Sequence, residues 1–151
     1  MLAAAPDSAP ATPAGPQWVV LTCDDVRLAV PLARVREILT PRPFTRLPGC
    51  GPEVCGLTAV RGRVITVFDL SAVLGRRAAA TVADHRLLLV DRNDRAVGLA
   101  VDAVVTIAPA ELRAGAEPRL SDRDGVIGIG DIDNQRFAAL DLDHLLERLL
   151  R

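Results

Sequence analysis

The sequence predicts an all-β protein made of two small, similar barrels, with one short helix at its C-terminus. Half of the 151 residues are hydrophobic but only 3% are aromatic, so Val, Leu, Ile and Ala must fill the core, and β-branched residues favour sheets. The apolar residues come in short runs separated by turn residues. Two short segments also recur about 71 residues apart, which indicates two similar halves within one domain.

Seven apolar runs have the length and composition of strands, and most of them are joined in pairs by polar turns. Residues 24 and 25 join the first pair, residues 91–95 join another, and residues 133–135 join the last. The polar segment 61–63 leads into a strand of its own. The predicted strands span residues 18–23, 26–30, 64–68, 86–90, 96–101, 126–132 and 136–140.

Helix signals are fewer. Ser71 to Leu74 is predicted to form one helical turn that ends at Gly75, because glycine readily takes the left-handed conformation that follows many helices. Residues 142–150 carry leucines at helical spacing. The sequence therefore predicts one clear helix, at the C-terminus.

The internal repeat has two members. Residues 28–30 (Leu-Ala-Val) recur as residues 99–101, and the Asp-Leu pair at 69–70 recurs at 141–142. The offsets are 71 and 72 residues, so the two matches agree on one period. A period near 70 is too long for a solenoid repeat. Two copies of a small barrel fit it better, because closing a sheet removes its exposed edges.

Residues 1–16 contain four prolines among Ala, Ser and Thr. Such a segment buries too little apolar surface to offset its ordering entropy, so we expect a flexible tail followed by a single domain of residues 17–151. The tail lacks the pattern of a signal peptide, and no apolar run approaches the roughly 18–20 residues of a membrane span. We therefore expect a cytoplasmic protein with no direct membrane insertion. A net charge of -1 with interleaved acids and bases disfavours nucleic acid as a partner.

No residue pattern supports catalysis. The two histidines, His85 and His144, lie outside any recognisable nucleophile–base motif. The three cysteines match no metal-ligand spacing, and their odd number in a chain without a secretory signal argues against a disulfide framework. The glycines at 125–130 fit no phosphate-binding motif, and the chain has no Lys to reach a phosphate. We expect no catalytic, metal or cofactor site, which alone indicates a β-rich interaction module.

A more specific pattern runs from residue 35 to residue 70. It contains Val-Arg-Glu-Ile at 35–38, a Pro-containing loop at 45–48, Gly-Leu-Thr-Ala-Val-Arg-Gly at 56–62, and Asp-Leu at 69–70. The second half adds Val-Gly-Leu-Ala-Val-Asp-Ala-Val at 97–104 and a closing segment at 125–146. In this order, over residues 17–150, the chain resembles the CheW family of chemotaxis coupling proteins. It departs from the family pattern at Ala59, usually Asn, and at Thr66, usually Pro, and loses a side-chain amide that would brace the turn before Arg61.

The resemblance implies two SH3-like β-barrels in a pseudo-twofold arrangement and a non-catalytic adaptor function. Family members bind the signalling tip of a chemoreceptor, a methyl-accepting chemotaxis protein, in the groove between the barrels. They bind the regulatory domain of a CheA-type histidine kinase through a barrel end. The implied partners are therefore this receptor tip and this kinase domain. An adaptor of the same fold in a different chemosensory pathway, serving surface motility or gene-expression control, is the alternative, because the partner defines the pathway.

Transferred by position, the receptor-side candidates are Val35, Glu37, Gly56 and Arg61. In this reading Val35 supplies apolar contact, Gly56 lets backbones approach closely, and Arg61 offers its planar donor fork to a carboxylate or carbonyl of the partner. Each also has a structural alternative. Val35 is then a core residue, Gly56 a position that needs a positive φ, and Arg61 the partner of Glu37 in an internal pair that fixes the loop.

Overall fold

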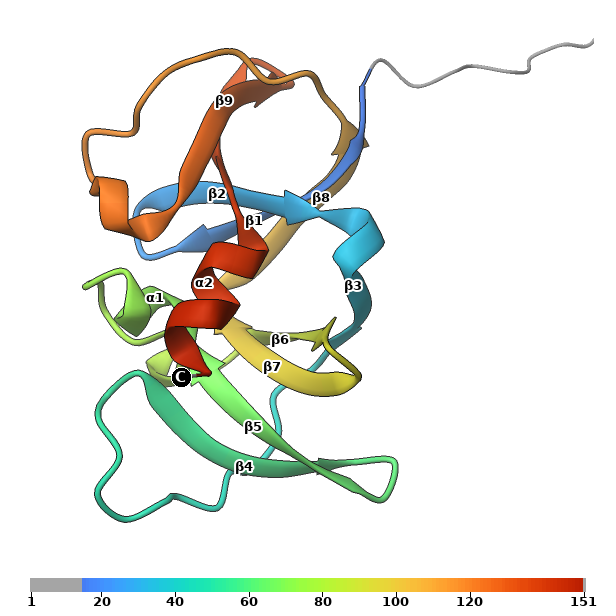
Figure 1. Cartoon of the computed structure of the whole chain (residues 1–151), viewed down its shortest axis with the longest axis vertical. Coiled ribbons are helices and arrows are strands. Elements are labelled where there is room, and N and C mark those ends of the chain that lie inside the picture. Colours follow the sequence, from blue (N-terminus) through green and yellow to red (C-terminus); the bar gives the residue numbers. More distant parts are fainter. Residues whose placement is uncertain (1–14, 151) are drawn as a thin grey trace, which may run out of the picture.

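The computed structural model describes residues 15–150. Within these residues the chain is mostly strand, with short connections and one longer helix (Figure 1). In chain order the elements are β1 (Gln17–Cys23), β2 (Val26–Pro31), η2 (Leu32–Arg34), β3 (Val35–Leu39), β4 (Val54–Val60), β5 (Arg63–Asp69), α1 (Leu70–Val73), η3 (Ala79–Thr81), β6 (Arg86–Arg92), β7 (Arg95–Val101), β8 (Ala103–Pro109), η4 (Asp122–Asp124), β9 (Val126–Ile132), β10 (Gln135–Leu140) and α2 (Leu142–Leu149). Most of the expected tail, residues 1–14, lies outside the described residues; at its end, the Pro16 carbonyl accepts a hydrogen bond from the Ala110 N–H.

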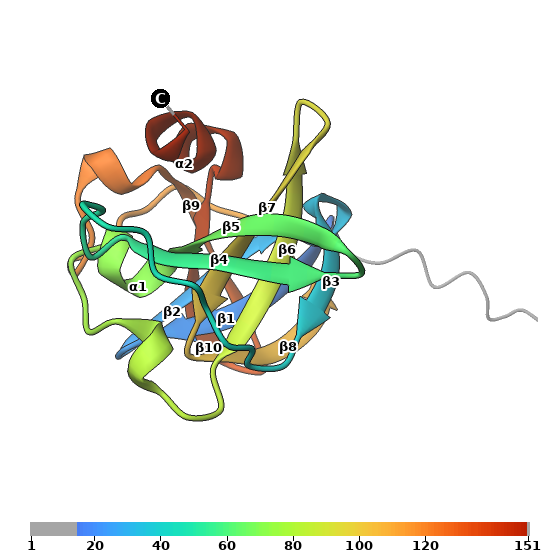
Figure 2. The same cartoon turned by 90° about the horizontal axis from the view of Figure 1, so that it is seen from below.

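The strands form two five-stranded sheets, and the prediction of an all-β fold with two small barrels is confirmed. The first has the order β8-β1-β2-β10-β9 and the second the order β3-β6-β7-β5-β4 (Figures 1 and 2). Backbone bridges close each sheet beyond its edge strands: Arg113 pairs with Ile129 in one, and Thr45 pairs with Leu57 in the other. We call the two closed sheets the first barrel and the second barrel.

The two halves of the sequence interlock. The first barrel takes β1 and β2 from the N-terminal half and β8, β9 and β10 from the C-terminal half, and the second barrel reverses this division. Parallel pairing joins the halves in both cases, β10 with β2 and β5 with β7. The Asp-Leu repeat therefore marks equivalent positions at the ends of β5 and β10. The Leu-Ala-Val match lies on equivalent strands, β2 and β7, but is out of register: Ala29 pairs with Ala139, and Gly98 pairs with Val67, the residue 72 positions before Ala139, so Ala29 matches Gly98 rather than Ala100. Neither half makes a barrel by itself.

The repeated Asp residues show this equivalence at the level of single hydrogen bonds. Asp69 precedes α1 and accepts a hydrogen bond from the Ala72 N–H, and Asp141 precedes α2 and accepts one from the His144 N–H. A carboxylate at this position satisfies a backbone donor that has no partner within the helix. The same residue therefore starts the helix at the end of each half.

Three apolar clusters hold the fold together. The largest lies between the barrels and contains Val19 and Leu99, whereas Val20 and Ala100 point into the interiors of the first and second barrels. Because successive side chains of a strand point to opposite faces, β1, β2, β6 and β7 are buried on both faces. That double burial explains the continuous apolar runs in these strands.

Three strands were not predicted: β3, β4 and β8. Charged Arg36 and Glu37 interrupt β3, a glycine interrupts β4, and β8 follows β7 after one residue without a recognisable turn. The C-terminal helix was predicted to within one residue, and the short turn at 71–74 is found as α1, one residue earlier. Among residues 15–150, no helix has the length and apolar character that crossing a membrane requires.

Candidate functional site

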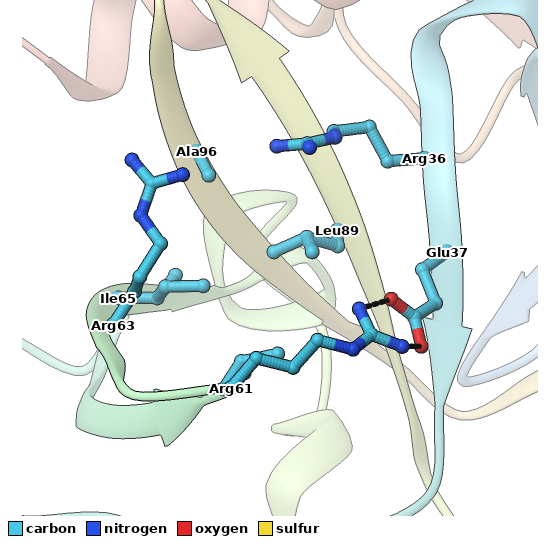
Figure 3. A pocket seen from close by; sticks show the side chains of 8 residues that line it. Arg36, Glu37, Arg61, Arg63, Ile65, Leu89 and Ala96 are labelled. Carbon is cyan, nitrogen blue, oxygen red and sulfur yellow. Dashed lines mark hydrogen bonds and ion pairs between the residues drawn. The ribbon is translucent and has the colours of Figure 1, made fainter.

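The mouth of the second barrel holds a cavity of about 350 Å³ (Figure 3). Its walls come from β3, the β4–β5 hairpin, β6 and β7, and its floor is apolar, made by Val60, Ile65, Leu89 and Ala96. Four charged side chains surround this floor: Arg36, Glu37, Arg61 and Arg63. Two of the four residues expected to bind a partner, Glu37 and Arg61, therefore meet here.

Arg61 occupies an unfavourable backbone conformation. It begins the tight turn between β4 and β5 with φ 51°, followed by Gly62 with φ 79°. The turns at Asn93-Asp94 and Asp133-Asn134 also place two successive residues at positive φ. Asn, Asp and Gly tolerate the left-handed region, whereas a long side chain such as that of arginine is disfavoured there. An arginine kept at this cost points to a role for its side chain.

The Arg61 guanidinium forms a two-pronged pair with the Glu37 carboxylate. Its Nη1 donates to Oε1, and its Nη2 donates to Oε2 at 2.6 Å. These hydrogen bonds lower the pKa of Glu37 from its ordinary 4.5 and raise the pKa of Arg61. Since β3 and β4 are the two edge strands of this sheet, the pair joins its edges across the mouth. The internal pair named above as an alternative is therefore present, but the Arg61 side chain stays 71% exposed and accessible to a partner.

Gly56 lies below the mouth, where residues 40–53, which we call the strap, cross the edge of β4. Its φ is 136°, and a Cβ there would collide with the Thr45 carbonyl oxygen. Thr45 and Leu57 exchange two backbone hydrogen bonds of 2.8 Å at this point. Gly56 thus permits a close approach of two backbones that both belong to this chain, and its positive φ is the structural alternative named for it; its expected role toward a partner stays a prediction.

The strap also makes hydrogen bonds to the end of β4 near Ala59. The Arg42 Nη1 donates to the Ala59 carbonyl at 2.9 Å, and the Thr58 hydroxyl donates to the Pro43 carbonyl at 3.0 Å. These bonds hold the end of β4 from the strap side, while the Arg61–Glu37 pair holds the turn from the β3 side. The turn is thus braced without the side-chain amide.

Val35 lies apart from the mouth. It is half-buried, pairs with Val90 and packs against the central core between the barrels. Val104 of β8 packs against the same core, and Ile107 of β8 is 45% exposed. Both views of the fold place β3 and β8 on the same side of the molecule (Figures 1 and 2). The four sequence candidates therefore fall at three places: the mouth, the strap and the seam between the barrels.

The first barrel has an equivalent mouth, with a cavity of about 450 Å³. Ile132, Asp133, Gln135 and Phe137 line it, each 72 positions after the residue that it matches in the second barrel. Val105 of β8 has no paired residue on β1, because the register shifts there. Arg36 of β3 likewise has no paired residue on β6. Thus Val105 and Thr106 stand where Arg36 and Glu37 stand in the other mouth.

This comparison identifies two residues that the sequence interpretation missed, Arg36 and Arg63. Both line the mouth beside Arg61, and the equivalent positions in the first barrel hold Val105 and Gln135. The 72-residue offset was visible in the sequence and would have paired Arg63 with Gln135, but Arg36 could be aligned only once β3 and its irregular register were known.

The described residues offer little reactive chemistry. Burial raises the pKa of the Cys23 thiol to about 12, and burial together with the nearby Asp69 carboxylate raises that of Cys55 to about 12. Such thiols are poor nucleophiles at neutral pH. Within residues 15–150, no group of three or more His, Cys, Asp or Glu side chains is placed to hold a metal ion.

Known proteins of one family match this chain over almost all of the described length. A family model described as the CheW-like domain matches residues 17–150. A protein of Rhizobium etli named probable chemotaxis protein CheW is 30% identical over 135 residues, covering 85% of this chain and 86% of its own. The chemotaxis protein CheW of Rhizobium meliloti is 34% identical over 96 residues, which is 64% of this chain and 62% of that protein.

The fold has a match among solved structures. The scaffolding protein TtCheW of Thermoanaerobacter tengcongensis superposes with a TM-score of 0.76 over 90% of both chains, at 21% identity.

A relative with another name also matches in sequence. The protein PilI of Pseudomonas aeruginosa is 36% identical over 74 residues, which is 49% of this chain and 42% of that protein.

Proposed function

Because the chain belongs to the family of CheW-like domains, whose members are non-catalytic scaffolding adaptors, we propose that it couples a chemoreceptor to a CheA-type histidine kinase in the bacterial cytoplasm. The receptor's signalling tip, a helical hairpin, binds at the seam between the barrels. The regulatory domain of the kinase binds at a barrel end. The adaptor thereby holds the two partners together without chemistry of its own.

The Arg61–Glu37 pair is the observation that carries this proposal. Among residues 15–150, no such pair spans the mouth of the first barrel, so the fold does not require one. The second mouth keeps an arginine in a strained turn and holds its guanidinium in one orientation with a carboxylate. A fixed, accessible donor fork on a rigid hairpin is suited to recognising a protein surface.

The candidate residues lie at different places in the fold, and we assign them on that basis to the kinase domain or to the receptor tip. Arg61 and Glu37 lie at a barrel end, which favours the kinase domain for them rather than the receptor tip. Val35 lies at the seam, where it and Val104 of β8 both pack against the central core while staying partly exposed, and an apolar face of a helical hairpin finds contact there. Gly56 supports both surfaces indirectly, by allowing the strap to close the second barrel.

The test compares Arg61→Asn, Glu37→Gln and the double variant by titration with the kinase's regulatory domain and with a receptor-tip fragment. Asparagine suits the left-handed turn, so Arg61→Asn should fold while removing the donor fork. We expect it to weaken binding of the kinase domain about ten- to a hundredfold and to leave binding of the receptor tip nearly unchanged. Glu37→Gln keeps the shape of the acid but releases Arg61, and should weaken binding less.

Two results would contradict parts of this proposal. If both single variants lower the melting temperature, the double variant is less than additive and kinase-domain binding is unchanged, the pair only fixes the loop. If wild-type protein binds neither partner, the adaptor assignment fails altogether.

A different chemosensory pathway is the second candidate, because two relatives, PilI and the protein FrzA of Myxococcus xanthus, carry names other than CheW. Identification of the receptor and kinase that co-purify with this chain from its native cell separates the two pathways.

A further inference from the structure

The mouth of the second barrel carries an excess of positive charge. Its cavity adjoins another of about 200 Å³, and the two are lined by four arginines (Arg36, Arg61, Arg63 and Arg95) and two acids (Glu37 and Asp94). The chain as a whole has a net charge of -1, so this excess is local.

Two of these arginines have no acidic partner in the described part of the chain. Arg61 is paired with Glu37, and Arg36 contacts the Asp91 carboxylate at 3.2 Å. No ion pair or hydrogen bond among residues 15–150 involves the side chain of Arg63 or Arg95. Figure 3 shows Arg36 and Arg63 on opposite sides of the apolar floor formed by Leu89 and Ala96. The floor is thus flanked by two guanidinium groups, one of which is uncompensated.

The equivalent mouth of the first barrel shows that this charge is not required for folding. It is built from the equivalent strands of the other sheet and has a cavity of similar size, but of the described residues one arginine, Arg27, and one acid, Asp133, line it. Val105 replaces Arg36, and Gln135 replaces Arg63. Two mouths of one architecture therefore differ in charge at the positions that face solvent, while their floors stay apolar.

From this charge and this floor we propose that the mouth of the second barrel binds an acidic segment of its protein partner. An apolar side chain of that segment rests on Ile65 and Leu89, and carboxylates on either side of it reach Arg36 and Arg63. The inference rests on the proposed function, in which this barrel end meets the kinase's regulatory domain, and adds the chemistry that selects the partner. Basic or uncharged segments are disfavoured, because they leave the arginines of the mouth without a counter-charge.

The test uses variants copied from the first barrel. Arg63→Gln and Arg36→Val introduce the residues that the equivalent mouth already has, so both should fold normally. Arg136→Gln on β10 is the matched control, since it removes the same charge from an exposed strand position outside the mouth. Each variant is titrated with the purified regulatory domain of the CheA-type kinase from the same genome, at salt concentrations from about 0.05 to 0.5 M.

We expect Arg63→Gln to weaken binding about two- to fivefold at low salt, and Arg63→Glu to weaken it further. The double variant Arg36→Val/Arg63→Gln should bind with a much smaller salt dependence than the wild type, and Arg136→Gln should match the wild type. The inference is overturned if Arg63→Gln and Arg136→Gln behave alike, or if wild-type binding does not change with salt. In those cases the kinase domain still binds and the proposed function stands. If the wild-type protein binds no kinase domain at all, both the proposed function and this inference are wrong.

Discussion

Replacing Gly56 with alanine tests whether this residue serves the partner or the strap. The positive φ of 136° costs a non-glycine residue about 1–3 kcal/mol. The new Cβ also collides with the Thr45 carbonyl, so the strap must move away and lose the two backbone hydrogen bonds between Thr45 and Leu57, at about 1 kcal/mol each. We therefore expect the free energy of unfolding to fall by about 3–5 kcal/mol, a large part of what a domain of this size has.

The assay is urea unfolding combined with amide hydrogen exchange. In Gly56→Ala the amides of Thr45 and Leu57 should exchange much faster than in the wild type, because they lose each other as partners. Gly49→Ala is the matched control: it lies on the same strap with φ 79°, but a Cβ there meets nothing within 4 Å. It should cost only the conformational part, about 1 kcal/mol. If Gly56→Ala is no less stable than Gly49→Ala and keeps both amides protected, yet loses partner binding, then Gly56 contacts the partner directly and the reasoning from the strap is wrong.

Three further predictions follow from the fold. Asp69→Ala should destabilise the protein by about 3 kcal/mol or more, because the Asp69 carboxylate accepts hydrogen bonds from the N–H groups of Ala72, Ala79 and Ala80. Asp141→Ala should cost only about 1 kcal/mol, because Asp141 accepts one such bond. Urea unfolding measures both losses, and equal losses would contradict this. At pH 8 a thiol reagent should label only exposed Cys50 in the native protein and all three cysteines in urea. The reason is that the pKa values of Cys23 and Cys55 are raised to about 12, so both thiols stay protonated in the folded protein. Rapid labelling of Cys23 or Cys55 in the native protein, detected by mass spectrometry, would refute this prediction. Residues 1–82 and 83–151, expressed separately, should each lack a cooperative melting transition by circular dichroism and gain one on mixing, because each barrel needs strands of both halves; a half that melts cooperatively alone would disprove the interlocked fold.

Local patterns in the sequence determined which elements could be predicted. Hairpins whose strands are buried on both faces and whose turns are polar, such as β6–β7, were visible as apolar runs around a charged segment. The strand β3 was not, because Arg36 and Glu37 belong to the mouth rather than to the core, and their charges interrupt the pattern of a strand. The charged residues that line the mouth thus concealed the strand that carries them, and a candidate site is where local sequence rules are expected to fail.

The site was predictable only in part for a related reason. The pairing of Arg61 with Glu37 was an explicit alternative, because both residues lay in the pattern that resembles the CheW family. The separation of Val35 from that pair depends on which face of β3 each side chain occupies, and the irregular register between Val35 and Glu37 changes that face. No local sequence pattern marks this irregular register, so the faces that Val35 and Glu37 occupy could not be predicted from the sequence.

The repeat offers a way to separate folding from function within this one chain. Positions that a barrel needs should keep the same character in both copies, and they do. The helix-starting residue is Asp in each, at 69 and 141, and the bridge and floor positions stay apolar: Leu57 and Ile129, Ile65 and Phe137. The positions that differ in charge, above all Arg61 against Asp133 and Arg63 against Gln135, lie at the rims of the two mouths. Since the two mouths are built from equivalent strands and the turns at Arg61 and Asp133 both have two positive φ values, backbone geometry gives no reason for these differences. The proposal that the two rims serve different contacts accounts for them, and an exchange of rim residues between the barrels is therefore expected to alter binding while leaving the fold intact.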